Sequence, residues 1–426
     1  MSKNNDKWDW ILGQAPPPLD PHSKVKHQLV TDYLQRYIGV LMANQRMPSL
    51  KLTLVDGFAG GGLYSDGAGT ALGSPLLLLQ TVREAEARLN LDRRSSPRKV
   101  DAHYHFVELK KSNFDYLKNA LHAEGHTDRI GRDIALYQSD FETVCKSIVS
   151  SAQARKGGQR ALFLLDQYAY DDIKLSTVQH ILSQLQGAEV ILTFNVDSLL
   201  AFLADTDQFH NITRKIGLEE HIDWAGYAQL KAQKRWREVI QRQIAYGIWK
   251  ASGARFMTLF FVTPRGDTPW SYWLVHLSNA YKANDVMKAV HWEHGNSFGH
   301  SLEAGLFQIG YQANRDESVT GQKGFDFSSP AAFDTLLHKA SVATLQEQLP
   351  KMIHECSAGI PFIDLMEGIA NQTNATADIV RESLHQHILT KEVQAFKADG
   401  GIRTKGSSIH GNDILVPNKQ KSFFLY

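Results

Sequence analysis

Short runs of apolar, often β-branched residues recur along the first two thirds of the chain, and segments with helical spacing separate them. This alternation predicts a parallel α/β sheet. The last two runs are joined by residues 264–269, a segment too short for a helix, so we expect them to pair antiparallel. The predicted strands are 52–56, 102–108, 134–140, 161–166, 189–195, 256–263 and 271–278.

An acidic residue ends each of the first four predicted strands. These residues are Asp56, Glu108, Asp140 and Asp166. Ligands of open parallel sheets lie beyond the carboxyl ends of the strands, so the four side chains should gather along one edge. This convergence is the main functional signal in the sequence.

A glycine cluster follows the first of these acids. Glycine permits a close backbone approach to a ligand and positive φ angles, and Asp56 can accept hydrogen bonds from ligand hydroxyl or ammonium groups. The pattern indicates a turn that binds a nucleotide-type ligand, although a plain loop would have the same composition. Ser74 and Pro75 then suit the start of a helix.

Five parallel-type strands, a closing antiparallel hairpin and acids after the first four strands together resemble the class I S-adenosylmethionine-dependent methyltransferase fold. More narrowly, Val55–Gly60, Gly73–Pro75 and Tyr272–His276 resemble the three-Cys-motif partner protein family (TcmP), and Lys26 fits the same pattern. The resemblance covers roughly residues 20–300. It implies a methyltransferase-like fold and a three-Cys-motif partner protein as a binding partner.

The resemblance also implies a role for each residue around S-adenosylmethionine. The glycine turn would surround the methionine part, Glu108 would bind the ribose hydroxyls, and Asp140 would contact the adenine amine. Sites for a nicotinamide dinucleotide carry an acid about 20 residues past the glycines. Glu108 lies 46 residues past Gly62 (108 − 62). The predicted cofactor-binding residues are Asp56, Phe58, Gly60, Gly62, Glu108 and Asp140.

Asp166 and Tyr168 occupy the place where amino-methyltransferases often carry an acidic or Asn residue, two prolines and an aromatic residue. The prolines are absent here. The carboxylate can accept a hydrogen bond from a target amine, and Tyr168 or Tyr170 can stack on a target ring. The alternative is that Asp166 only caps the next helix. No cysteine lies here for attack on cytosine C5.

The region after the sheet predicts a second domain. A Gly- and Asn-rich stretch over 295–324 precedes a helix at 331–349, and a helix-turn-helix pattern over 361–389 precedes two short strands. This order resembles a winged helix. The predicted domains are therefore 1–325, with a helical insertion over about 205–250, and 330–426, a helical linker with the winged helix-turn-helix.

Basic residues in two places are candidates for nucleic-acid contact. Arg381 lies on the second helix of the helix-turn-helix, and Arg403 and Lys405 lie in the wing, whereas Lys234 and Arg235 lie in the helical insertion. Nearby acids dilute the positive charge. Winged helices also bind proteins, and a basic helix face is often only solvated, so DNA or RNA binding is one of two interpretations.

Composition sets the remaining limits. A chain of 426 residues with 43% hydrophobic and 21% charged residues can fill more than one core. The formal net charge of +1 gives no global argument for nucleic-acid binding. Two distant cysteines, no long apolar run and no signal-peptide pattern favour a cytoplasmic protein without a disulfide framework, a metal site or a membrane span.

The first hypothesis is an S-adenosylmethionine-dependent methyltransferase that modifies a nitrogen of a nucleic-acid base. A second is a non-catalytic accessory protein with a degenerate methyltransferase fold that recruits a partner enzyme to nucleic acid. A weaker third is a Mg²⁺-dependent nuclease that uses the clustered acids.

Overall fold

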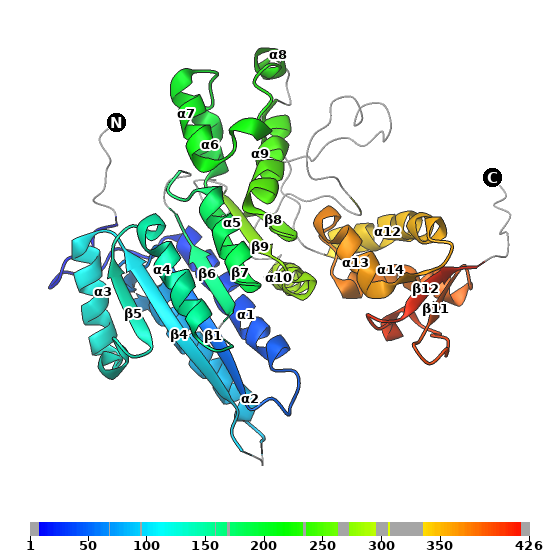
Figure 1. The fold of residues 1–426 in the computed structure, drawn as a ribbon, viewed down its shortest axis with the longest axis horizontal. Helices are drawn as coiled ribbons and strands as arrows, with labels where there is room; N and C mark the ends of the chain where they lie inside the picture. The colour runs from blue at the N-terminus through cyan, green and yellow to red at the C-terminus, as the bar shows by residue number, and fades with distance from the viewer. Residues whose placement is uncertain are drawn as a thin grey trace.

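The computed structural model shows a large α/β unit beside a smaller C-terminal α+β unit (Figure 1). It describes residues 8–67, 69–93, 96–157, 159–167, 171–232, 236–262, 272–294, 306 and 335–418.

A seven-stranded sheet forms the centre of the large unit, in the order β5-β4-β1-β6-β7-β9-β8. Neighbouring strands are parallel from β5 through β7, and β9 runs antiparallel to both β7 and β8. The mostly parallel sheet and its antiparallel closing pair are therefore confirmed. The strands are β1 Ser49–Asp56, β4 Lys99–Glu108, β5 Ile134–Gln138, β6 Arg160–Leu165, β7 Gly187–Phe194, β8 Phe256–Val262 and β9 Tyr272–Ser278. A separate hairpin, β2 Leu63–Asp66 and β3 Gly69–Leu72, follows β1.

Helices cover both faces of this sheet, which explains the apolar runs in its strands. In β1, Leu52 and Leu54 pack under the helices of one face, whereas Val55 packs under those of the other. The first face carries α1 Pro21–Leu41, α2 Ser74–Asn90, α3 Lys111–Ala123 and α10 Tyr281–His294; the second carries α4 Phe141–Ala154, α5 Leu175–Gln184 and α9 Trp236–Ser252. Among the described residues, no helix combines the length and apolarity needed to cross a membrane.

The helices between β7 and β8 project beyond the edge at which β6 and β7 end (Figure 1). They begin directly after β7, because Asn195 caps the first of them through the Ser198 amide. Lys215 on the second helix contacts Asp171 in the loop after β6 at 3.1 Å. This insertion therefore stands beside the carboxyl edge of the sheet. Before α9 it contains α6 Val196–Phe202, α7 Asp207–Ile216 and α8 Tyr227–Lys231.

The C-terminal unit has its own core and a small antiparallel sheet in the order β10-β12-β11. Helices α12 and α14 pack against each other and cover that sheet. Leu345 of α12 and Leu384 of α14 are fully buried. The elements are α12 Thr335–Glu355, β10 Ile360–Pro361, α13 Phe362–Ile369, α14 Ala377–Leu389, β11 Val393–Phe396 and β12 Ile414–Pro417.

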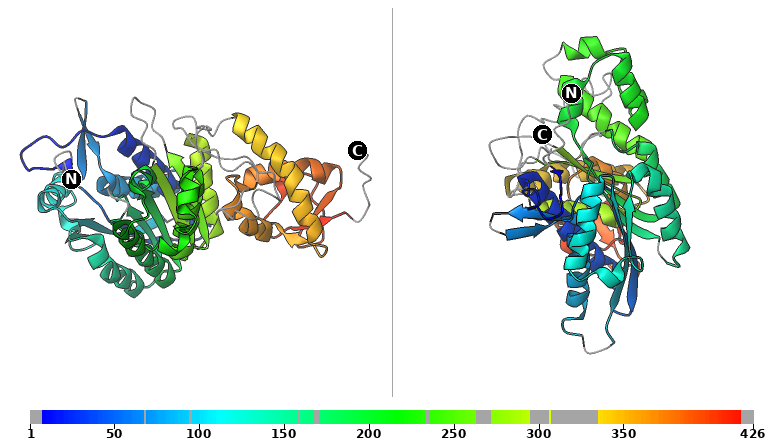
Figure 2. Two further views of the ribbon diagram at one scale, coloured as in Figure 1. Left: turned by 90° about the horizontal axis from the view of Figure 1, so that it is seen from above. Right: turned by 90° about the vertical axis from the view of Figure 1, so that its left-hand side faces the viewer.

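The C-terminal unit packs against α10 of the large unit, at the β8 end of the sheet (Figure 2). Lys288 Nζ donates a 2.7 Å hydrogen bond to the Ala370 carbonyl oxygen, and Trp292 Nε1 donates one of 2.8 Å to the Asn374 carbonyl oxygen. Burial lowers the pKa of Lys288 to about 7. These direct contacts join the two units through buried and half-buried groups.

Candidate functional site

Asp56 ends β1 in a fully buried position, with 0% of its surface exposed. Its Oδ1 accepts a 3.1 Å hydrogen bond from the Phe58 amide, which turns the chain away from the strand. Burial raises the pKa of Asp56 to about 7, although the Ser74 hydroxyl and the Phe58 amide both oppose the rise. Asp56 is therefore poised to carry or lose a proton near neutral pH.

The glycine turn that follows is held by the acid at the end of the neighbouring strand. Glu108 Oε2 accepts a 2.9 Å hydrogen bond from the Gly60 amide, and its Oε1 accepts one of 2.8 Å from the Lys110 amide. Gly60 and Gly62 have φ angles of 57° and 80°, which side chains other than glycine rarely adopt. Burial raises the pKa of Glu108, against these same hydrogen bonds. The structure thus brings two of the predicted elements together.

A segment that sequence analysis did not include lies over this turn. We call residues 8–19 the N-terminal strap. Its Trp10 side chain is only 3% exposed, and its Nε1 donates a 2.5 Å hydrogen bond to the Leu63 carbonyl oxygen. A β-carbon on Gly61 would lie 2.1 Å from Cγ of Trp10, so the indole packs directly on the turn. The pair of tryptophans at positions 8 and 10 was the available signal.

Polar contacts fix the strap to the corner between β4 and α3. Asp9 forms an ion pair with Lys110. The Trp10 amide donates a 3.1 Å hydrogen bond to Asn113 Oδ1, and Asn113 Nδ2 donates one of 3.3 Å to the Trp8 carbonyl oxygen. The strap therefore closes one side of the predicted cofactor site.

Asp166, the predicted catalytic acid, lies at the end of β6 and pairs with Lys26 of α1. Lys26 Nζ lies 2.6 Å from each carboxylate oxygen, and the side chains of Lys26 and Asp166 are 16% and 28% exposed. The lysine also lies 5.6 Å from the centre of the buried Tyr272 ring. Next to it, burial lowers the pKa of His27 to about 4, which keeps that ring neutral.

The loop after Asp166 is held by a different side chain. Gln167 Oε1 accepts a 3.0 Å hydrogen bond from the Ile173 amide. The contacts of Asp166 are thus those of an ion pair with Lys26 rather than of a helix cap. Tyr168 and Tyr170 lie outside the described residues, so the predicted aromatic partner stays a prediction.

Asp140 caps α4 at the edge of the predicted adenine site. Its carboxylate accepts hydrogen bonds from the Thr143 amide at 2.8 Å and from the Thr143 hydroxyl at 2.7 Å. The hydroxyl contact lowers the pKa of Asp140. This exposed carboxylate already has a structural role, and its contact with adenine stays a prediction.

The residues predicted to contact nucleic acid differ in whether their charge is already paired within the protein. Arg381 bonds Asp378 at 2.7 Å, and Arg403 makes a two-pronged ion pair with Asp413 at 2.7 and 3.2 Å. Lys405 is exposed in the segment between β11 and β12. Lys234 and Arg235 lie outside the described residues, so their contact with nucleic acid stays a prediction.

The part of the chain that the structure describes contains no cluster of side chains suited to bind a metal ion. There, no three His, Cys, Asp or Glu side chains lie together as a set that could hold a metal ion. Asp166 neutralises Lys26, and Asp140 caps a helix. The described geometry therefore offers nothing in favour of the Mg²⁺ nuclease hypothesis.

Comparisons with known proteins give only distant likenesses. No family model and no curated protein matches the chain. A protein of Legionella pneumophila, LPL1258, is similar with a TM-score of 0.35 at 11% identity, over 64% of this chain and 92% of its own. An rRNA methylase of Streptococcus thermophilus gives 0.28 at 10% identity (59% and 93%), and the methyltransferase domain of METTL16 gives 0.30 at 10% (65% and 76%). Likenesses this distant carry no argument about activity, and membership of the three-Cys-motif partner family stays a prediction.

Proposed function

We propose that this chain is an S-adenosylmethionine-dependent methyltransferase that acts on a nitrogen of a nucleic-acid base in the cytoplasm. The observation that carries the proposal is the bond between Glu108 and the Gly60 amide, which joins the turn after β1 to the acid that ends β4. Asp166 ends the strand on the other side of β1. Cofactor and acceptor groups would thus share one edge of the sheet.

The residues present fit the cofactor. Each oxygen of Glu108 accepts one backbone amide, and the Asn113 side chain and the Leu109 amide also hydrogen-bond to this carboxylate, so the ribose hydroxyls would share it with these groups. The glycines let the backbone approach the methionine part, near Asp56 and Phe58. S-adenosylmethionine, when bound, supplies an electrophilic methyl group.

Asp166 would position the acceptor nitrogen. A carboxylate has about four lone-pair positions, so it can keep its two contacts with Lys26 and still accept an N–H bond from a target amine. Lys26 fixes the orientation of that carboxylate. Holding the nitrogen in line with the methyl group is the main rate advantage that such a site can give.

The test is calorimetric titration of the full chain with S-adenosylmethionine and S-adenosylhomocysteine, with NAD as the control ligand. We expect micromolar binding of the first two that Glu108→Ala abolishes. Glu124→Ala, an exposed acid at the far end of α3, is the matched control and should bind normally. Normal binding by Glu108→Ala, with its fold intact by circular dichroism, would remove the site assignment.

A second candidate, the non-catalytic accessory protein, is favoured by the strap. Trp10 packs on the glycine turn, and Lys26 already occupies the Asp166 carboxylate. In this version the chain binds a partner, such as a three-Cys-motif protein, and transfers no methyl group. Cofactor binding without transfer to DNA, RNA or protein acceptors, together with capture of the partner, would support it over the enzyme.

We also propose that the C-terminal unit is a winged helix that contacts nucleic acid. The support is its element order, with three helices and a sheet in the order β10-β12-β11. Lys405 would meet phosphate, whereas Arg381 and Arg403 hold the unit together through their internal ion pairs. A protein partner is the alternative occupant of this surface.

A further inference from the structure

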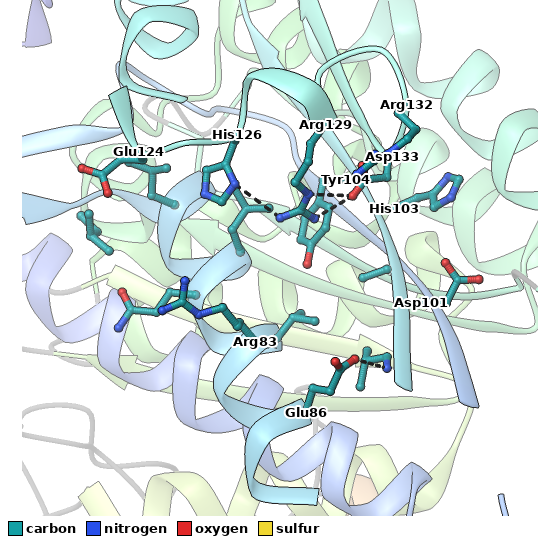
Figure 3. Close-up of a pocket in the computed structure, with 17 residues that line it drawn as sticks. Arg83, Glu86, Asp101, His103, Tyr104, Glu124, His126, Arg129, Arg132 and Asp133 are labelled. Carbon is teal, nitrogen blue, oxygen red and sulfur yellow. Dashed lines mark hydrogen bonds and ion pairs between the residues drawn. The ribbon is translucent and has the colours of Figure 1, made fainter. Parts of the chain in front are cut away.

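The other edge of the sheet carries a cavity that the proposed methyltransferase site does not use. It has a volume of about 620 Å³ and lies between α2, the amino half of β4 and the loop after α3 (Figure 3). Asp56, Glu108 and Asp166 do not line it. Its size falls within the range of about 300–1,000 Å³ of small-molecule sites.

One wall and the floor of this cavity are apolar. Leu76, Leu79 and Val82 face it from α2, and Val100 and Ala102 face it from β4. The edge of β4 beside this floor is open, because β5 pairs with β4 only from Tyr104 onward. In the described part of the chain, the preceding residues of β4 have no neighbouring strand on that side. A ligand here would bury apolar surface against buried side chains.

The opposite rim is basic. Arg129 and Arg132 extend from the loop between α3 and β5, and Arg83 lies across from them on α2 (Figure 3). Arg129 bonds Asp133 at 2.9 and 2.7 Å, and Arg132 reaches the same carboxylate at 3.3 Å. Among the described residues, Arg83 has no hydrogen-bond or ion-pair partner.

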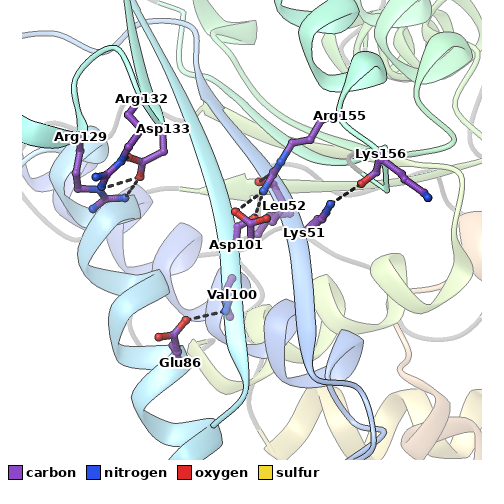
Figure 4. A network of polar contacts seen from close by, with 10 residues as sticks. All are labelled: Lys51, Leu52, Glu86, Val100, Asp101, Arg129, Arg132, Asp133, Arg155 and Lys156. Atoms are coloured by element: carbon purple, nitrogen blue, oxygen red, sulfur yellow. Dashed lines mark hydrogen bonds and ion pairs between the residues drawn. The ribbon is translucent and has the colours of Figure 1, made fainter. Parts of the chain in front are cut away.

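Three of the four acids that line the cavity are already occupied (Figure 4). Glu86 accepts a 2.7 Å hydrogen bond from the Val100 amide, and Asp101 pairs with Arg155 at 2.6 Å. Asp133 is shared by two arginines, and only the exposed Glu124 remains. The amide bond leaves the negative charge of Glu86 in place, so the formal charges of these side chains balance. What the rim offers an anion is guanidinium donors, above all those of Arg83.

His126 lies between Arg129 and Arg83. Burial lowers the pKa of His126; Arg129 and Arg83 lower it further, whereas Glu124 and Asp133 raise it. The two arginines thus converge on one position from different elements. An anion bound at this position would counteract the effect of both arginines on the pKa of His126.

We propose that this cavity binds an organic anion with an apolar body, such as a phosphate monoester or carboxylate of an aliphatic chain. The anionic group meets Arg83 and Arg129 beside His126, and the apolar body lies on α2 and β4. Guanidinium groups suit phosphate and carboxylate because they offer paired donors. The ligand comes either from solution or from a lipid surface.

The test uses octyl phosphate, below its micelle concentration, in calorimetric titrations of the full chain. We expect binding that weakens at least about tenfold in the Arg83→Gln/Arg129→Gln double variant and in Ala102→Leu, which fills the floor. Arg88→Gln, an exposed arginine on the same helix outside the cavity, is the matched control. Inorganic phosphate and octanol should each bind much more weakly than octyl phosphate.

A second readout is the titration of His126 by NMR, where octyl phosphate should raise the pKa of the ring. Sedimentation with phosphatidic acid vesicles, lost in the same double variant, would assign the ligand to a lipid surface, and binding of octyl phosphate alone would assign it to solution. Failure of the wild-type chain to bind octyl phosphate, or equal binding by the double variant, would overturn the proposal. Binding of S-adenosylmethionine, measured in parallel, keeps this result separate from the proposed function.

Discussion

The two ends of β4 differ in how they use charge. At the carboxyl end, Glu108 is half-buried and holds backbone amides, and the strap covers the neighbouring turn. At the amino end, Asp101 and the arginines form partly exposed ion pairs around an open cavity. Buried carboxylates have raised pKa values, because desolvation is not offset, whereas exposed pairs are screened by water. Strong coupling to folding is therefore expected at the first edge and weak coupling at the second.

The largest effect should come from opening the closed edge. Trp10→Ala removes a nearly fully buried indole from the glycine turn, and we expect the free energy of unfolding to fall by about 3–5 kcal/mol, as for other buried aromatic truncations. Association of S-adenosylmethionine should become faster. Urea unfolding and stopped-flow fluorescence measure the two effects. Trp8→Ala, at a more exposed neighbouring position, is the control. Equal losses of stability in both variants would contradict the role of the Trp10 contact with the glycine turn.

A pH series examines Asp56. Its folded pKa of about 7 is above the usual unfolded value, so the protonated form is favoured by folding, and stability is lost as pH rises through 7. Between pH 5 and pH 8 the wild-type chain should lose about 3 kcal/mol. Asp56→Asn should remove that slope.

The control for this series is Asp140→Asn. The pKa of Asp140 is lowered, so its contribution is lost only as pH falls through that lowered value, below the range tested. Its profile between pH 5 and pH 8 should match that of the wild-type chain. A wild-type profile with no slope over this range would contradict the burial argument for Asp56.

The ion pair of Lys26 and Asp166 should have an intermediate effect. Lys26→Met leaves a partly buried carboxylate without its partner, which should cost about 1–3 kcal/mol and lower methyl transfer more than cofactor affinity. A double-mutant cycle with Asp166→Asn measures the coupling. Additive losses would show that the two side chains act independently.

The smallest effect is expected at an exposed residue of the C-terminal unit. Lys405→Ala should weaken duplex DNA binding by about two- to fivefold and reduce the salt slope by about one, because one phosphate contact is lost. Fluorescence anisotropy at two salt concentrations measures both. Lys351→Ala on α12 is the control. Unchanged affinity and slope would favour a protein partner for this surface.

Sequence patterns were sufficient for the sheet because its strands are buried on both faces and each helix segment keeps its own period. The acid-ended strands and the glycine turn were visible for the same reason, since they are local signals. The closeness of Glu108 to the glycine turn followed from topology, because parallel neighbours end at one edge, but its hydrogen bond to the Gly60 amide was not predicted. These features need only local periodicity and a simple rule of connection.

What could not be predicted depends on contacts between distant segments. Trp10 reaches the turn across 51 residues (61 − 10), and Lys26 is 140 residues from Asp166. No local pattern marks such a pair. The cavity at the amino edge is formed by three separate segments and by the late start of β5 along β4, so no local pattern marks its arginines.

The contact of α10 with the C-terminal unit bears on how a long substrate would be selected. Lys288 and Trp292 donate hydrogen bonds directly to backbone carbonyls across that contact, which leaves little freedom for one unit to swing against the other. Under the proposed function, a nucleic acid bound by the C-terminal unit would then present the base to be modified at a fixed distance from the bound segment. Substrates whose target base lies nearer or farther than this distance would react poorly, even where both the bound segment and the target base fit their sites.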